Sequence, residues 1–267
     1  MDIYFKRHFF VAFLDTSFSS WRIINESDYY QDTLNPVFWT KRSGEYLLDP
    51  IVRKKLVSIA REFYEKYTHI AKNVEIEDIQ LTGSLANYSY TPYSDLDVHV
   101  LVDLSKINGA KDVVRSSVDG IRFIWNLRHD IKIRGHEVEV YLQDYKQEHH
   151  STGLYSLLRD EWVKKPKHSP PSVSDEDVEK KYRSMATDIE KLEGKLLSAQ
   201  HVPSNAKELY SLANKLKKKI MKMRNESLVK GGEFSVGNLA FKKLRNNEYI
   251  GRLNDVISLS YDSIYNE

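Results

Sequence analysis

Four acidic residues in this chain have the type and the spacing needed to bind divalent metal ions. Asp95 and Asp97 lie two positions apart in the segment SDLD, and Glu137 and Glu139 lie two apart in the segment HEVEVY. Side chains alternate across a β-strand, so each pair would point to one face of a sheet. Like charges held close together need a cation, and magnesium prefers carboxylate and phosphate oxygens.

A third carboxylate usually completes a two-metal site, and either glutamate could supply it here. We favour Glu139, because valines flank it and so place it deeper in the sheet; Glu137 remains the alternative. Two magnesium ions held by Asp95, Asp97 and Glu139, or manganese in their place, would bridge a triphosphate. They would also orient an attacking hydroxyl group and stabilise a departing pyrophosphate.

Gly83 and Ser84 lie upstream of the aspartates and suit a phosphate-binding turn. A glycine allows the backbone to approach a phosphate closely, and the serine hydroxyl and nearby amides can donate hydrogen bonds to it. Phosphoryl-type transfer needs little more from a protein than such positioning and charge.

The elements around these residues alternate between helix and strand. Asp49 is a suitable N-cap and Pro50 suits a first turn, so a helix is predicted over 49–67. Strands are predicted over 76–82 and 95–103, a helix over 110–127, and a strand pair over 129–143 that turns near Gly135. This pattern predicts an α/β (α+β) layered domain.

The remainder of the chain is predicted to be helical. A proline-rich linker over 164–174 separates it from the first part, because three prolines cannot lie within a helix. Apolar residues at helical spacing then mark one helix from Val178 to Leu196 and another from Leu209 to Met223, ended by the glycines at 231–232. A third helical stretch is predicted over 236–264. We therefore predict a catalytic domain over 1–163, with an aromatic N-terminal segment that has no assigned elements, and an α-helical domain over 175–267.

The combination of Gly83-Ser84, the SDLD segment and a later strand carboxylate resembles the DNA-polymerase-β-like nucleotidyltransferase superfamily. The resemblance implies a small mixed sheet with helices against it and a helical second domain. It also implies that Asp95, Asp97 and Glu139 hold two magnesium ions. Gly83, Ser84 and Ser94 would contact the nucleotide. The third acid of that superfamily is commonly aspartate, and a glutamate stands at this position here.

Longer stretches resemble uncharacterised nucleotidyltransferases found in bacteriophage genomes, from about Asn35 to the C-terminus. The matching segments are TGSLANY at 82–88, WN at 125–126, HD at 129–130, GHEVEVY at 135–141 and STGLYS at 151–156. No settled substrate comes with this likeness.

These observations predict transfer of a nucleoside monophosphate from a nucleoside triphosphate, with ATP favoured, to an acceptor, with release of pyrophosphate. The acceptor stays open between a protein, tRNA or other RNA, a second nucleotide and a small molecule. The alternative is a non-catalytic regulator that binds a nucleotide or RNA. The cations clustered on the second helix could contact a triphosphate or nucleic acid, or could simply form a solvated helix face; these are Lys215, Lys217, Lys218, Lys219, Lys222 and Arg224.

Several weaker signals have an ordinary explanation beside a functional one. Asn238, Lys242 and Arg245 share one helical face and could line a cleft between the two domains, although the same helix could simply pack into a core. Tyrosines 88, 90 and 93 could stack a base or merely cover the loop. The pair at 129–130 is interpreted as the edge of a strand, and the histidines at 149–150 as part of a surface loop.

Composition is ordinary for a globular protein of 267 residues with a net charge of +2 and no cysteine. The absence of cysteine excludes disulfides and thiolate zinc sites. The longest apolar run near the start, Phe9 to Leu14, is too short to span a membrane and is predicted to be a buried strand. We expect no membrane association and a cytoplasmic location, which is the host cytoplasm if a phage encodes the protein.

Overall fold

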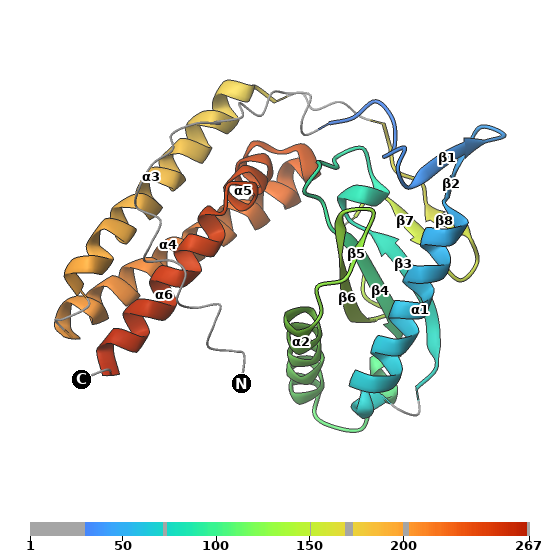
Figure 1. The fold of residues 1–267 in the computed structure, drawn as a ribbon, viewed down its shortest axis with the longest axis horizontal. Helices are drawn as coiled ribbons and strands as arrows, with labels where there is room; N and C mark the ends of the chain where they lie inside the picture. The colour runs from blue at the N-terminus through green and yellow to red at the C-terminus, as the bar shows by residue number, and fades with distance from the viewer. Residues whose placement is uncertain (1–29, 72–73, 150, 169–172, 200–202, 266–267) are drawn as a thin grey trace.

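The computed structural model describes residues 30–265 except 72–73, 150, 169–172 and 200–202. The fold is α+β: a mixed six-stranded sheet with helices comes first, and a helical region, α3–α6, follows (Figure 1). The strand expected over residues 9–14 lies outside the described residues. The division of the chain at 163 and 175 stays a prediction.

The sheet has the strand order β5-β6-β4-β3-β7-β8, and all neighbours are antiparallel except β4 and β6, which run parallel. Its strands are β3 (Ile76–Thr82), β4 (Leu96–Val102), β5 (Lys132–Ile133), β6 (His136–Asp144), β7 (Leu154–Ser156) and β8 (Glu161–Lys164). The predicted strands at 76–82 and 95–103 and the pair turned near Gly135 are confirmed. β7 and β8 were not predicted, because three or four residues carry too little periodicity.

One face of the sheet is apolar and the other is polar. Valines 98, 100, 138 and 140 lie on the apolar face and are at most 5% exposed. Two helices, α1 (Pro50–Tyr67) and α2 (Lys111–Arg128), pack against β4 and β6. The opposite face carries the acidic side chains and is not covered by these helices, so polar chemistry is possible there.

Helix α1 begins where its sequence predicts. The Asp49 carboxylate accepts hydrogen bonds from the backbone amides of Ile51 (2.9 Å) and Val52 (3.1 Å), and Pro50 occupies the first turn. Phe63 of α1 is fully buried and meets the ring of Trp125 of α2 edge-on, with the centroids 5.4 Å apart. The two helices are thereby fixed on the same core.

A β-hairpin occupies part of the aromatic segment that was left without assigned elements. It comprises β1 (Trp39–Arg42) and β2 (Glu45–Leu48), joined by Ser43 and Gly44 at φ +49° and +89°. Both turn residues have positive φ, as a tight two-residue hairpin turn requires, and a Ser-Gly pair between two short runs is a recognisable signal for it.

The helical region has its own hydrophobic core, built from α3 (Asp175–Ala199), α4 (Pro203–Gly231), α5 (Val236–Asn246) and α6 (Tyr249–Tyr265). The stretch 236–264 is helical as predicted, but it forms two helices, because the helix is interrupted at Asn247 and Glu248. Glu248 has φ +62°, a left-handed conformation that cannot continue an α-helix. Two short polar residues, Asn246 and Asn247, precede it and favour helix ends over helix interiors.

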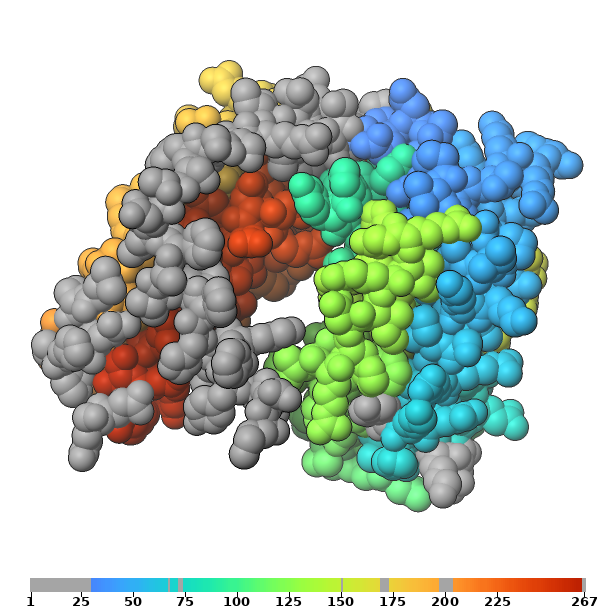
Figure 2. Space-filling view, in the orientation of Figure 1, coloured from blue at the N-terminus to red at the C-terminus, as the bar shows by residue number. Residues whose placement is uncertain are grey.

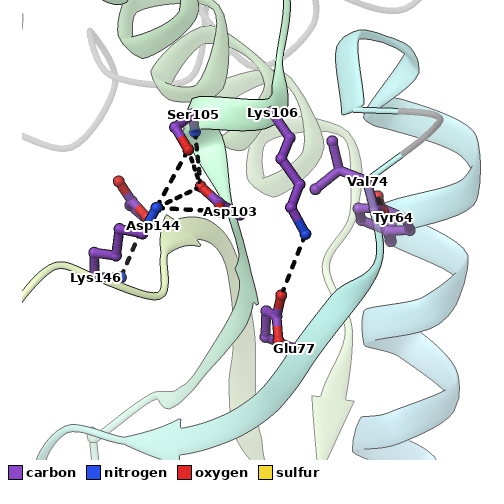
Figure 3. A network of polar contacts seen from close by, with 8 residues as sticks. All are labelled: Tyr64, Val74, Glu77, Asp103, Ser105, Lys106, Asp144 and Lys146. Carbon is purple, nitrogen blue, oxygen red and sulfur yellow. Dashed lines mark hydrogen bonds and ion pairs between the residues drawn. The ribbon is translucent and has the colours of Figure 1, made fainter.

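A polar network closes the end of the sheet away from the acidic residues (Figure 3). The Asp103 carboxylate, just after β4, accepts hydrogen bonds from the Ser105 amide (3.0 Å) and from the Lys146 ammonium group (3.1 Å). The Lys146 amide in turn donates to Asp144 at the end of β6 (3.2 Å). These contacts join the ends of the two parallel strands.

Among the described helices, none is both long enough and apolar enough to cross a membrane.

Candidate active site

The parallel pairing of β4 and β6 brings the predicted acids together. Asp97 lies directly opposite Glu139 in the register, and Asp95 immediately precedes β4. Residues paired in this way project from the same face of a sheet, so the three carboxylates share the polar face. The acids come from two strands that lie more than 40 residues apart in the sequence, and only the tertiary fold brings them together.

The register distinguishes the two glutamates. Glu139 pairs with Asp97, and the hydroxyl of Tyr141 donates a hydrogen bond to its carboxylate. Glu137 lies at the exposed end of β6, where it forms an ion pair with Lys132 at 3.5 Å. The pairing therefore favours Glu139 as the third acid of the site.

Burial and mutual repulsion destabilise the charged forms of the aspartates. Burial, Glu139 and Asp95 together raise the pKa of Asp97 to about 7. Burial also raises the pKa of Asp95 to about 6, although the nearby Arg245 guanidinium opposes this rise. Carboxylates held in this state gain stability from any cation that replaces the lost water.

Gly83 lies directly against the Asp97 side chain. It has φ +73°, and a Cβ atom added there would lie 1.9 Å from the Asp97 Oδ2 atom. Any other residue would therefore displace the carboxylate as well as strain the backbone. This contact explains why the Gly-Ser turn needs a glycine at position 83: a side chain there would displace the Asp97 carboxylate.

The loop between Gly83 and Asp95 is closed by hydrogen bonds between its two ends. The Ser94 hydroxyl accepts from the Ser84 hydroxyl (2.8 Å) and from the Thr91 amide (2.9 Å). Ser94 is buried, whereas Ser84 is half-buried and lies at the start of the 3-10 turn η3 (Ser84–Ala86). Of the predicted nucleotide-binding residues, Gly83 and Ser84 thus border the acids, and Ser94 holds the loop that carries them.

Two packing contacts support this loop from behind. The Trp39 indole of the hairpin donates a hydrogen bond to the Leu85 carbonyl (2.7 Å). Gly153 lies so close that an added Cβ would be 1.9 Å from the Ala86 carbonyl oxygen. The unpredicted hairpin and β7 therefore fix the turn beside the acids.

Cationic side chains of the helical region face the acids. The Arg245 guanidinium of α5 lies 3.9 Å from Asp95, and the Lys242 ammonium group lies 3.4 Å from the Ser89 carbonyl oxygen. Asp97 is close enough to Lys242 and to Arg224 of α4 to favour their charged forms. Two of the three residues predicted to line a cleft, Lys242 and Arg245, are thus beside the acids. Figure 2 shows an opening between the red helices and the yellow-green strands.

The other basic residues of α4 are not part of this cluster. The five lysines predicted as possible phosphate contacts are all exposed. Two of them make ion pairs within the helical region, Lys219 with Asp188 at 3.6 Å and Lys222 with Glu226 at 3.7 Å. Arg224, in contrast, is half-buried and close enough to Asp97 for that carboxylate to favour its charged form. Sequence spacing alone did not single it out.

The remaining weak signals have mostly ordinary positions. Tyr88 and Tyr90 pack against the core of the sheet, and Tyr93 is 61% exposed. His129 caps the end of α2 against Trp125, and the neighbouring Asp130 pairs with Lys132. None of these contacts places them beside the acids.

Sequence reasoning also missed Tyr141 and Glu233. Tyr141 lies two residues after Glu139 on β6, and therefore on the same face of the strand. The period-two alternation of β6 could have indicated this position. Glu233, just before α5, accepts hydrogen bonds from the Asn87 amide group (2.9 Å) and the Ser89 hydroxyl (2.8 Å). Nothing local predicts that contact, because it joins segments almost 150 residues apart.

The donor chemistry and the backbone register of the three acids fit a hard divalent cation. Their side chains, however, are not arranged to coordinate a metal ion. In the described part of the chain, no group of three or more His, Asp or Glu side chains could hold a metal ion in the present geometry. The Glu139 carboxylate is instead engaged by the Tyr141 hydroxyl. The fit therefore depends on the strand pairing and on the raised pKa values of the aspartates.

Comparisons with protein-family models, with curated proteins and with solved structures found no match to this chain.

Proposed function

We propose that this protein is a metal-dependent nucleotidyltransferase of the DNA-polymerase-β-like kind. The observation that carries the proposal is the in-register pairing of Asp97 with Glu139 on parallel strands, with Gly83 packed against the Asp97 carboxylate. Destabilised carboxylates beside a close glycine turn need both a cation and a ligand that approaches the backbone. A nucleoside triphosphate with its magnesium ions meets both needs, and ATP is the favoured donor.

In the proposed reaction, an acceptor hydroxyl oxygen forms a bond to the α-phosphorus of the nucleotide. The bond from that phosphorus to the oxygen bridging the α- and β-phosphates breaks, and pyrophosphate leaves with those electrons. The acceptor proton passes to Glu139. Bound magnesium ions would supply neutralisation of the phosphate charge.

The protein's own groups position the reactants. Asp95, Asp97 and Glu139 would hold two magnesium ions, for which manganese could substitute. Ser84 and the backbone at Gly83 would donate hydrogen bonds to phosphate oxygens. The acceptor is proposed only as a class, a hydroxyl or similar group on protein, RNA, a nucleotide or a small molecule.

The test is incubation of the protein with each α-labelled nucleoside triphosphate, magnesium and a cell lysate as the source of acceptors. We expect label to appear in protein, RNA or small molecules, together with pyrophosphate. Asp95→Asn and Asp97→Asn should abolish both signals, whereas Asp130→Asn should not, since Asp130 forms its ion pair with exposed Lys132 and not with a residue of the site.

A folded protein that releases no pyrophosphate with any nucleotide would contradict the proposal. Nucleotide or RNA binding that survives loss of both aspartates would then favour the regulatory alternative.

A further inference from the structure

We infer that Arg224, Lys242 and Arg245 of the helical region form a polyphosphate-binding half-site that faces the acids across the opening. This inference rests on the proposed function, because it assigns the phosphate groups of the same nucleotide to residues of α4 and α5. The ligand would lie between the sheet and the helices, with its metal ions toward the acids and its phosphates toward these cations.

The first argument is the cost of burying these cations. Burial lowers the pKa of Lys242 and of Arg224, so the protein interior disfavours both positive charges. Among the residues that the structure describes, no carboxylate lies within 4.0 Å of either group, whereas Arg245 has Asp95 at 3.9 Å. Glu233 and Asp97 favour the charged form of Lys242, and Asp97 that of Arg224, but none of these carboxylates is in direct contact with either half-buried cation. An anionic ligand between them would supply the missing contact and offset the cost of burial.

The second argument is that side chains hold these cations in place. The Arg224 Nε atom donates to the side-chain Oδ1 atom of Asn238 (3.4 Å). Asn238 is itself buried, and its side-chain Nδ2 atom donates to the Glu233 backbone carbonyl (2.7 Å). The Arg224 guanidinium also lies over the Phe241 ring, 4.4 Å from its centroid. An arginine that merely covered a surface would not need a buried amide to orient it.

The third argument is the charge pattern of the whole site. Three acids project from the sheet and three cations from the helices, yet only one pair of them, Asp95 with Arg245, is within 4.0 Å among the described residues. Opposite charges that served only to bind the two parts together would be in direct contact. A gap between them suits a ligand that carries both signs, and a metal-bound triphosphate is such a ligand.

The test uses the full chain and inorganic triphosphate with magnesium, with the dissociation constant measured by calorimetry. Arg224→Gln and Lys242→Gln should each weaken binding about tenfold or more, since each removes a charge-assisted hydrogen bond. Lys218→Gln is the matched control, because Lys218 is an exposed lysine of the same α4 and should leave the constant unchanged. Circular dichroism checks that each variant is folded, and Arg224→Lys should lie between the native protein and Arg224→Gln.

The inference is overturned if the native protein does not bind triphosphate, if folded Arg224→Gln and Lys242→Gln bind as the native protein does, or if Lys218→Gln weakens binding equally. Each result is independent of nucleotidyl transfer. A protein that binds triphosphate through these cations but labels no acceptor would sink the transferase proposal alone. If transfer requires Asp97 but triphosphate binding does not require Arg224 or Lys242, this inference alone is contradicted.

Discussion

At the scale of single residues, the Asp97 carboxylate is held in the interior against its own electrostatic preference. Its pKa of about 7 arises from burial first and from Glu139 and Asp95 next. An unfolded chain would restore the ordinary value near 4. Folding therefore becomes less favourable as the pH rises from the unfolded pKa to the folded one, and this penalty is fully present above about pH 7.

We predict that Asp97→Asn abolishes transfer yet stabilises the protein without metal. Loss of a metal ligand should lower the rate more than about 100-fold. Removing the buried charge should raise the free energy of unfolding by up to roughly 4 kcal/mol at pH 8, because the Asp97 pKa rises from its ordinary value to about 7 on folding. Thermal melts across pH check this: the difference in Tm should be largest near pH 8 and should nearly vanish by about pH 4. A variant less stable than the native protein at pH 8 would contradict this account of the site.

Two glycines with positive φ provide a matched pair of substitutions. Gly83→Ala would place a Cβ 1.9 Å from the Asp97 carboxylate, whereas Gly44→Ala meets nothing within 4 Å. Gly44→Ala should lose about 1 kcal/mol of stability through backbone strain, and Gly83→Ala should lose more, because it adds the clash with Asp97. Only Gly83→Ala should also lose transfer, by two orders of magnitude or so, because it moves an acid of the site. Steady-state kinetics and chemical denaturation of both variants decide the matter, and equal activity in the two would show that the contact is unimportant.

At the scale of elements, the strands that carry the acids could be predicted from sequence because their patterns are strong. The segment 95–103 and the segment around Glu139 both alternate with buried valines, and this alternation gave the face of each acid correctly. Their parallel pairing in register could not be predicted, since no local pattern states which strands are neighbours. The structure supplies that pairing.

The elements that were missed are short or depend on distant contacts. The hairpin β1–β2 has four residues in each strand, and Trp39 of β1 stacks on the distant Trp162 of β8 with the ring centroids 4.7 Å apart. The break between α5 and α6 depends on one residue in a left-handed conformation, Glu248, within a stretch of continuous helical periodicity. Arg224 was not distinguished from its neighbouring lysines because only the tertiary fold decides which side of α4 faces the acids.

The network around Asp103 makes a prediction about the far end of the sheet (Figure 3). Hydrogen bonds from Ser105 and Lys146 lower the pKa of Asp103. The resulting stability is present above the unfolded pKa, near 4, and is lost as the pH falls through the lower folded value. Asp103→Asn should thus lower Tm at pH 7 and have a progressively smaller effect in acid, without changing transfer. Melts at pH 7 and about pH 3 measure this, and an equal loss of Tm at both would show that charge is not the cause.

At the scale of the whole molecule, one carboxylate joins the loop of the sheet to the helical region. Glu233 accepts hydrogen bonds from Asn87 and Ser89, and Lys242 donates to the backbone of Ser89. The loop that forms these bonds also carries Ser84 and leads into Asp95. The position of the helical cations relative to the acids is therefore set partly by Glu233.

We predict that Glu233→Ala lowers the transfer rate at subsaturating nucleotide about tenfold, because two hydrogen bonds to a charged acceptor are lost. The effect should fall mainly on KM, since Glu233 positions the cations and touches no reacting atom. Glu233→Gln keeps an oxygen that accepts one such bond and should be intermediate. Glu226→Ala is the control, because Glu226 forms an ion pair with exposed Lys222 within α4. Native kinetics in folded Glu233→Ala would exclude this role.

The separation of the two hydrophobic cores gives each part of the molecule its own optical signature. The chain has four tryptophans, and none lies after residue 163. Three of them, Trp39, Trp125 and Trp162, lie in or against the core of the sheet, and Trp21 is outside the described residues. The fluorescence of these three indoles consequently follows the sheet, while ellipticity at 222 nm is weighted toward the helical region, which contains the long helices α3 and α4. Coincidence of the two denaturation curves would mean that the parts melt together, and divergence would measure how weakly one supports the other.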